Sequence, residues 1–69
     1  MSDKSLGQFI RERRKSLGLT QERLAEKCGL THGSIARFET GSHRPDLNSM
    51  ILLAEALAVP LDELARMDG

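Results

Sequence analysis

The chain has no tryptophan, no tyrosine, two phenylalanines and a single cysteine among its 69 residues. One cysteine cannot form an internal disulfide, and it offers no ligand spacing of the kind that metal sites need. With so few aromatic side chains and 39% apolar residues, the core must be small and mainly aliphatic. The sequence therefore predicts one small domain over residues 1–69, stabilised by helix packing and helix caps.

Long apolar runs are also missing. No segment approaches the roughly 18 consecutive apolar residues of a membrane-spanning helix. The first ten residues lack the apolar stretch of a secretory signal. We therefore expect a cytoplasmic protein that has no membrane partner.

The net charge is zero, but the charged residues are divided unevenly along the chain. Residues 1–45 contain nine Lys or Arg and five acids, whereas residues 46–69 contain one base and five acids. A basic first part can present a positive face to a polyanion. A short sequence can also reach such a division by chance, so charge alone leaves both interpretations open.

Apolar residues recur at helical spacing through most of the chain, and no segment alternates as a half-buried strand would. Glycines 18, 29 and 41 are placed to end three helices, and Pro60 is placed to open a fifth. We expect an all-α fold of five short helices. The apolar positions of these helices are Leu6, Phe9, Ile10, Leu17, Leu24, Ala25, Cys28, Ile35, Phe38, Leu47, Met50, Ile51, Ala54, Leu57, Leu61, Leu64 and Ala65.

Thr20 and Thr31 begin two helices in the same way. Each follows a leucine and stands four residues before another apolar residue, which predicts a threonine N-cap with a hydrophobic staple. The helix after Thr31 has no acid in its first three positions. Its amino end therefore stays electropositive, which suits an anion such as a phosphate.

Eight residues between positions 20 and 39 have the types and spacing of a helix-turn-helix: Gln21, Leu24, Ala25, Cys28, Gly29, Leu30, Ile35 and Phe38. With RRKSLGLTQ before them and LAEALAVPLDEL after them, the chain from about Leu6 to Leu64 resembles the Cro/repressor-type (XRE-like) helix-turn-helix family. Ala25 is small where the two helices would cross, and Gly29 can take the positive φ of the turn. The resemblance implies a compact, lambda repressor-like five-helix bundle that binds DNA.

In this family the first, second and sixth residues of the third helix face the bases of the major groove. The resemblance therefore implies base reading by His32, Gly33 and Arg37, with Ser34 close by. The planar guanidinium of Arg37 can bond O6 and N7 of one guanine. His32 can meet a base edge or a phosphate. Gly33 has no side chain, so either the helix approaches the groove more closely there, or this position reads no base and DNA shape contributes.

The resemblance also implies contacts with the sugar-phosphate backbone, which position the protein and make binding depend on salt. The expected phosphate-binding residues are Gln21, Thr31, Thr40, His43 and Arg44. Arg14 and Glu39 match a pair that joins the first helix to the end of the third in similar domains. The alternative is two separate surface charges, which would contribute little to stability.

One such module reads only a few bases, so we expect a homodimer on a pseudo-palindromic operator in double-stranded DNA. Similar domains pair through their C-terminal helices. The residues left for this interface are Leu52, Val59, Leu61 and Met67, although all four can equally fill the core.

These features predict a transcriptional regulator, in particular a repressor. An antitoxin or a restriction-modification controller of the same fold is an alternative, and so is a protein-binding adaptor that never contacts DNA. No Ser/His/Asp or Cys/His arrangement has the supporting residues of a catalytic site, and Cys28 fits a small core position. We therefore expect no enzymatic activity, no cofactor, no metal and no small-molecule ligand.

Overall fold

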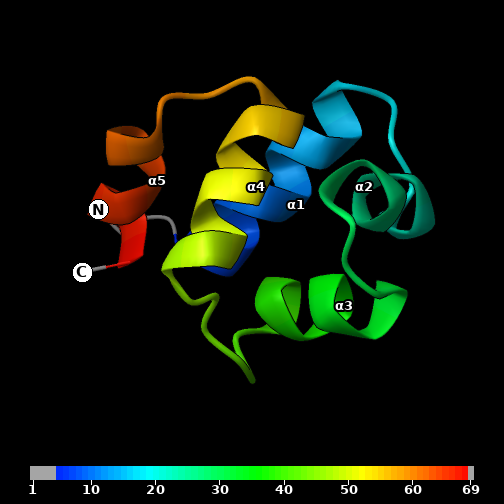
Figure 1. Ribbon diagram of the computed structural model, residues 1–69, viewed down its shortest axis with the longest axis horizontal. Coiled ribbons are helices and arrows are strands. Elements are labelled where there is room, and N and C mark those ends of the chain that lie inside the picture. The colour runs from blue at the N-terminus through cyan, green and yellow to red at the C-terminus, as the bar shows by residue number, and fades with distance from the viewer. Residues whose placement is uncertain (1–4, 69) are drawn as a thin grey trace.

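The computed structural model describes residues 5–68, which form five helices and contain no strand (Figure 1). The helices are α1 (Leu6–Ser16), α2 (Gln21–Cys28), α3 (His32–Thr40), α4 (Leu47–Leu57) and α5 (Leu61–Asp68). Helix α1 packs against α3, α4 and α5, while α4 packs against α1, α2 and α5. The predicted all-α fold of five helices is confirmed. None of these helices combines the length and the apolar character needed to cross a membrane.

Local caps fix the starts of α2 and α3 and the turn between these helices. The Thr20 Oγ1 accepts a hydrogen bond from the Arg23 backbone N–H at 3.1 Å, and the Thr31 Oγ1 accepts one from the Ser34 N–H at 3.1 Å. Gly29 ends α2 with φ of 72°, in the left-handed region that favours glycine. Both predicted threonine caps and the glycine turn are therefore present.

Other helix ends show features that the sequence patterns did not reveal. Asp46 caps α4, since its Oδ1 accepts from the Ser49 backbone N–H at 2.8 Å. This hydrogen bond lowers the pKa of the Asp46 carboxyl. Pro60 lies one residue before α5 rather than inside its first turn, and its carbonyl oxygen accepts from the Glu63 N–H at 3.1 Å.

The core is aliphatic and receives side chains from all five helices. Its largest fully buried members are Ile10, Leu24, Ile35, Leu53, Leu57 and Leu64. Phe38 is the aromatic residue buried with them, at 8% exposure, and Phe9 packs on the edge of the same cluster. Helix α3 packs against this core through Ile35 and Phe38.

The predicted apolar face of α4 was partly wrong. Leu47 is 70% exposed and Ile51 is 39% exposed, whereas Leu53 is completely buried. Helix α4 is apolar at most of its positions, so periodicity could not select one stripe. Contacts with α1, α2 and α5 instead select the stripe that contains Leu53. Leu17, at 40% exposure, and Ala65 also face solvent rather than the core.

Ala58 ends α4 in a left-handed conformation, with φ of 58°, and among residues 5–68 no other non-glycine residue has a positive φ. The Arg13 Nε donates to the adjacent Leu57 carbonyl oxygen at 2.9 Å, so this turn is held in place. We expect Ala58→Gly to stabilise the protein by about 0.5–1 kcal/mol, because glycine avoids the left-handed strain. Urea denaturation would measure the gain, with Ala56→Gly inside the helix as a destabilising control. A loss of stability in Ala58→Gly would contradict the prediction.

Candidate nucleic-acid interface

One flank of α3 is open to solvent along its whole length. On the opposite flank, the side chains of Ile35 and Phe38 are buried in the core. His32, Gly33 and Arg37 are exposed, and no part of the described chain covers them. The flank expected to face a base edge is therefore accessible, as an interface with a major groove requires.

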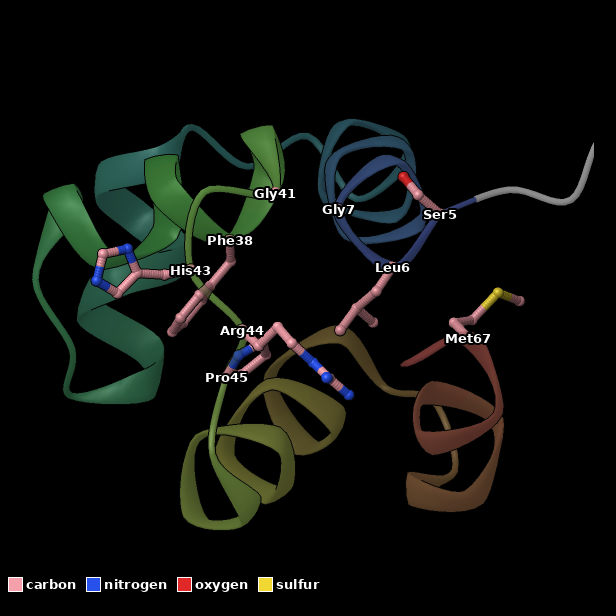
Figure 2. A pocket seen from close by; sticks show the side chains of 9 residues that line it. All are labelled: Ser5, Leu6, Gly7, Phe38, Gly41, His43, Arg44, Pro45 and Met67. Atoms are coloured by element: carbon pink, nitrogen blue, oxygen red, sulfur yellow. The ribbon is translucent and has the colours of Figure 1, made fainter. Parts of the chain in front are cut away.

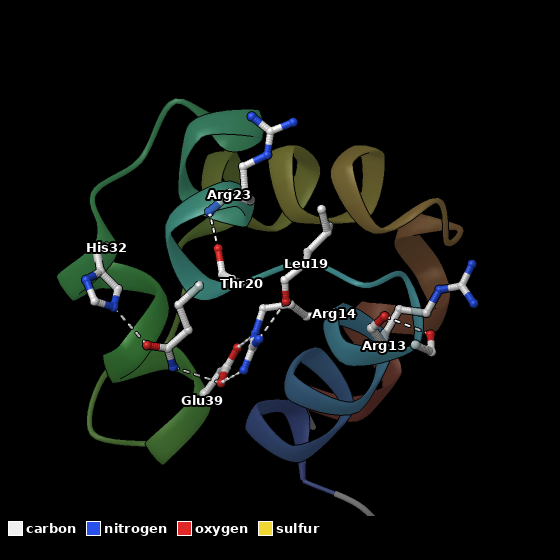
Figure 3. A network of polar contacts seen from close by, with 9 residues as sticks. Arg13, Arg14, Leu19, Thr20, Arg23, His32 and Glu39 are labelled. Carbon is white, nitrogen blue, oxygen red and sulfur yellow. Dashed lines mark hydrogen bonds and ion pairs between the residues drawn. The ribbon is translucent and has the colours of Figure 1, made fainter.

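A buried ion pair holds the end of α3 against α1. The Arg14 Nε donates to Glu39 Oε2 at 2.6 Å, and Arg14 Nη2 donates to Oε1 at 3.1 Å (Figure 3). The two side chains are only 9% and 4% exposed. The Arg14 Nη1 also donates to the Leu19 carbonyl oxygen at 2.8 Å, in the loop before α2. The bidentate geometry orients both side chains as well as pairing their charges.

The ion pair continues into a longer polar chain. Gln21 Nε2 donates to Glu39 Oε1 at 3.0 Å, and Gln21 Oε1 lies 2.9 Å from His32 Nε2. Arg14, Glu39, Gln21 and His32 therefore form one connected set, which we call the polar relay. It links α1, α2 and both ends of α3. Sequence reasoning paired only Arg14 with Glu39, although the placement of Gln21 and His32 at the first positions of adjacent helices was an available signal.

The expected phosphate-binding residues lie in two groups, one towards each end of α3. Gln21 and Thr31 stand at the starts of α2 and α3, where the Thr31 Oγ1 is also within 3.0 Å of the half-buried Ser34 Oγ. Thr40 ends α3, and His43 and Arg44 follow it in an exposed loop. In the sequence, these two groups precede and follow His32, Gly33 and Arg37, the positions expected to read bases.

A hollow lies beside this loop, between α1, α5 and the residues that follow α3 (Figure 2). Leu6, Phe38 and Pro45 are buried residues that line it. His43 and Arg44 also belong to its lining. Figure 2 shows the Arg44 side chain extending into this hollow, and both basic residues remain exposed.

Two helical glycines differ sharply in their surroundings. A Cβ at Gly7 would lie 2.5 Å from the Glu39 carbonyl oxygen and 2.6 Å from that of Phe38. At Gly33 the nearest atom would be Arg37 Nη1, at the ordinary contact distance of 3.6 Å. Packing within the chain therefore requires glycine at position 7 but not at position 33. Sequence reasoning missed Gly7, for which a glycine inside a helical pattern was the only signal.

The expected interface residues of α4 and α5 have mixed surroundings. Leu52, Val59 and Met67 are partly buried and pack against the core, whereas Leu61 is 36% exposed. Leu47 and Ile51, one turn apart on α4, form a second exposed apolar surface. Each of these surfaces is available for a partner.

The thiol of Cys28 is buried. Cys28 is 4% exposed, its Sγ lies 3.7 Å from the Leu52 carbonyl oxygen, and burial raises the pKa of its thiol. Within residues 5–68, no three His, Cys, Asp or Glu side chains cluster in a way that could hold a metal ion.

A helix-turn-helix family model matches residues 10–64. An uncharacterized transcriptional regulator in the ATPase CF(0) region of Rhodospirillum rubrum is 40% identical over 60 residues, which are 87% of this chain and 56% of that protein. An uncharacterized HTH-type transcriptional regulator of Methanothermobacter thermautotrophicus is 50% identical over 49 residues, or 71% of each chain. The chain spans about half the length of most of the curated relatives it matches.

Solved structures of repressor-type proteins share this fold. The P22 c2 repressor, in complex with a synthetic operator, superposes with a TM-score of 0.88 at 29% identity, over 96% of this chain and 100% of that one. The restriction-modification controller C.AhdI from Aeromonas hydrophila gives 0.82 at 37% identity, over 86% and 89%. SinR in complex with DNA gives 0.81 at 26% identity, over 87% and 97%. The expected lambda repressor-like fold is confirmed.

Proposed function

Since this chain belongs to the helix-turn-helix family of Cro/repressor-type transcriptional regulators, we propose that it represses transcription by binding a specific operator through α3. The observation that carries the proposal is the open flank of α3. His32, Gly33 and Arg37 are exposed there, while the buried Arg14–Glu39 pair fixes the helix from behind. A rigid helix with an accessible polar flank can present the same side chains to every base pair it meets.

The proposed complex places α3 in the major groove, which is about 12 Å wide and admits a helix. Arg37 would direct its guanidinium at a guanine edge. Gln21 and Thr31 would contact the phosphates on one side of the groove, and Thr40, His43 and Arg44 those on the other. The electropositive amino end of α3, which has no acid in its first turn, adds attraction for the phosphate chain.

A change at Arg37 and a change at Arg44 should have different effects on DNA binding. We expect Arg37→Ala to weaken binding to a selected operator and to relax preference at one base pair by about 1–3 kcal/mol. Arg44→Ala should weaken binding to all duplexes alike and reduce the salt slope by about one unit. Fluorescence anisotropy with operators selected from random duplexes, repeated at several salt concentrations, would measure both.

The same titration separates a DNA-binding regulator from a protein-binding adaptor. DNA binding should fall steeply as salt rises, because phosphate contacts release counterions. If Arg37→Ala leaves affinity and base preference unchanged, Arg37 is not a reading residue. If no duplex is selected above background, the regulator proposal is wrong.

We also propose a homodimer that places one α3 in each half of a pseudo-palindrome, with half-sites about one helical turn apart. The expected interface is formed by Leu52 of α4, Val59 of the α4–α5 turn, and Leu61 and Met67 of α5. Leu61 is 36% exposed, so it offers apolar surface to a second copy. Pairing would double the bases read and supply the affinity that one module lacks.

Leu61→Glu is expected to shift the protein towards monomer and to raise the operator Kd by about tenfold or more, because the second half-site then binds independently. Leu47→Glu is the matched control, since Leu47 is a more exposed leucine on the separate α4 surface. Sedimentation velocity and operator titration would measure both variants. Dissociation caused by Leu47→Glu alone would place the interface on α4 instead.

Control of a restriction-modification system is a second candidate. The 37% identity to C.AhdI favours it, because this exceeds the 29% identity to the P22 c2 repressor. Both functions use the same DNA-binding flank. A neighbouring gene for a nuclease or methyltransferase, together with binding to the promoter of that gene, would identify a controller protein.

A further inference from the structure

The polar relay determines which nitrogen of His32 carries a proton. The Glu39 carboxylate can only accept hydrogen bonds, so the NH₂ group of Gln21 must face its Oε1 at 3.0 Å. The amide oxygen of Gln21 therefore faces His32 Nε2, at 2.9 Å. A carbonyl oxygen also only accepts, so the Nε2 of His32 must be the donor.

The relay has little freedom to reverse. Glu39 is held by two bonds from Arg14, at 2.6 and 3.1 Å, and its side chain is 4% exposed. Rotation of the Gln21 amide would turn its oxygen towards the carboxylate, where two acceptors would meet. Residues from α1, α2 and α3 therefore fix the hydrogen-bond direction at the exposed end.

A neutral imidazole carries one N–H group, so His32 Nδ1 is then a bare acceptor. Figure 3 shows this nitrogen, which has no dashed bond, pointing away from the relay. We propose that the relay fixes His32 as a hydrogen-bond acceptor towards DNA, and that His32 thereby selects a base that presents an amino group in the major groove. This inference rests on the proposed DNA-binding function and specifies what the first position of α3 reads.

The acceptor character excludes most other contacts of neutral His32. Phosphate oxygens, the O6 and N7 of guanine and the O4 of thymine are all acceptors, whereas adenine N6 and cytosine N4 are donors in the major groove. His32 therefore reads adenine or cytosine rather than binding phosphate. Arg37, on the same exposed flank, has only donors and suits guanine. Two positions on the same flank of α3, five residues apart, thus recognise opposite hydrogen-bond patterns.

The ring proton can be measured in the free protein. Nitrogen-15 NMR of the imidazole rings at about pH 8, where histidine is mainly neutral, distinguishes the two N–H forms. We expect His32 to carry its proton on Nε2 to a greater extent than the exposed His43. In Gln21→Met, which keeps the side-chain length but removes the amide, the proportion should fall to that of His43. A proton on Nδ1 of His32, or no change in Gln21→Met, would overturn the relay.

Base preference is measured with the operator that the wild-type chain selects, changed one base pair at a time. One position of each half-site should prefer adenine or cytosine over guanine or thymine by about 3- to 10-fold. His32→Ala should abolish that preference, and Gln21→Met should reduce it. His43→Ala, the other histidine variant, should lower affinity for every duplex without changing any preference.

Preference for guanine or thymine at the position that His32→Ala affects would overturn the proposal. So would an unchanged preference in His32→Ala. If the wild-type chain selects no duplex, the proposed function fails and the base preference fails with it. The ring proton, measured without DNA, still decides whether the relay exists, so the two failures are distinguishable.

Discussion

Replacement of Glu39 by alanine is expected to lower the free energy of unfolding by about 3–5 kcal/mol. The reason is that Arg14, only 8% exposed, would keep a buried guanidinium without its counter-charge. For a domain of this size the melting temperature should fall by about 12 °C or more. Such a loss is a large fraction of the total stability of a small domain. Thermal and urea unfolding followed by circular dichroism would measure it.

An exposed ion pair of the same chain supplies the control. The Arg23 Nη1 lies 3.3 Å from Glu26 Oε1, and the two side chains are 68% and 69% exposed. Glu26→Ala should therefore cost less than about 0.5 kcal/mol, because solvent screens this pair. The comparison removes one glutamate in each case and differs in burial. Equal costs for the two variants would show that the buried pair does not hold α3.

A double variant separates charge burial from helix positioning. Arg14→Met combined with Glu39→Met fills the same space with apolar side chains, which often restores stability after loss of a buried pair. Gln21 would still lose its acceptor, since the bond to Glu39 Oε1 disappears. We expect a stable protein whose base preference at the His32 position is weakened. Full recovery of both properties would indicate that the pair acts on stability alone.

The features predicted correctly from the sequence are those that depend on near neighbours in the chain. Thr20 and Thr31 cap their helices through bonds that span three residues, and Gly29 needs only its own backbone angle. Helix α3 has Ile35 and Phe38 as its two fully apolar, large side chains, so its buried side was unambiguous. Local chemistry was sufficient in each of these cases.

The face of α4 depended on elements distant in the sequence. Leu47, Ile51 and Leu53 are equally apolar, and periodicity allowed several stripes on a helix with few polar residues. The packing of α1, α2 and α5 against α4 decided that Leu53 is buried and that Leu47 is 70% exposed. A pattern within one helix does not contain that information.

Some features of the candidate site were likewise predicted from the sequence, whereas others depend on the packing of distant elements. The pairing of Arg14 with Glu39 came from the family resemblance, and the structure brings these two side chains together. The links from Gln21 to Glu39 and His32 depend on how α2 and α3 cross, which no spacing within one helix specifies. The need for glycine at position 7 arises from carbonyl groups more than 30 residues away.

Gly7→Ala is expected to destabilise the protein by about 1–3 kcal/mol, although alanine is the better helix former. The added Cβ would lie 2.5 and 2.6 Å from the carbonyl oxygens of Glu39 and Phe38, both of which are backbone atoms that cannot rotate away. Helices α1 and α3 would have to separate by roughly 1 Å to restore ordinary contact. The shift should strain the Arg14–Glu39 pair and reduce operator affinity by about tenfold, since recognition needs sub-ångström placement.

Gly33→Ala is the matched change and should have the opposite effect on stability. Its Cβ would meet nothing closer than Arg37 Nη1 at 3.6 Å, so α3 should gain about 0.5–1 kcal/mol from the better helix former. Urea denaturation would measure the change in the free energy of unfolding for both variants. An increase in stability in Gly7→Ala would contradict the close contact between α1 and α3. Operator affinity then decides the role of Gly33. Unchanged affinity means that this position reads no base, whereas weaker binding by the more stable variant means that DNA approaches the backbone where the methyl group was added.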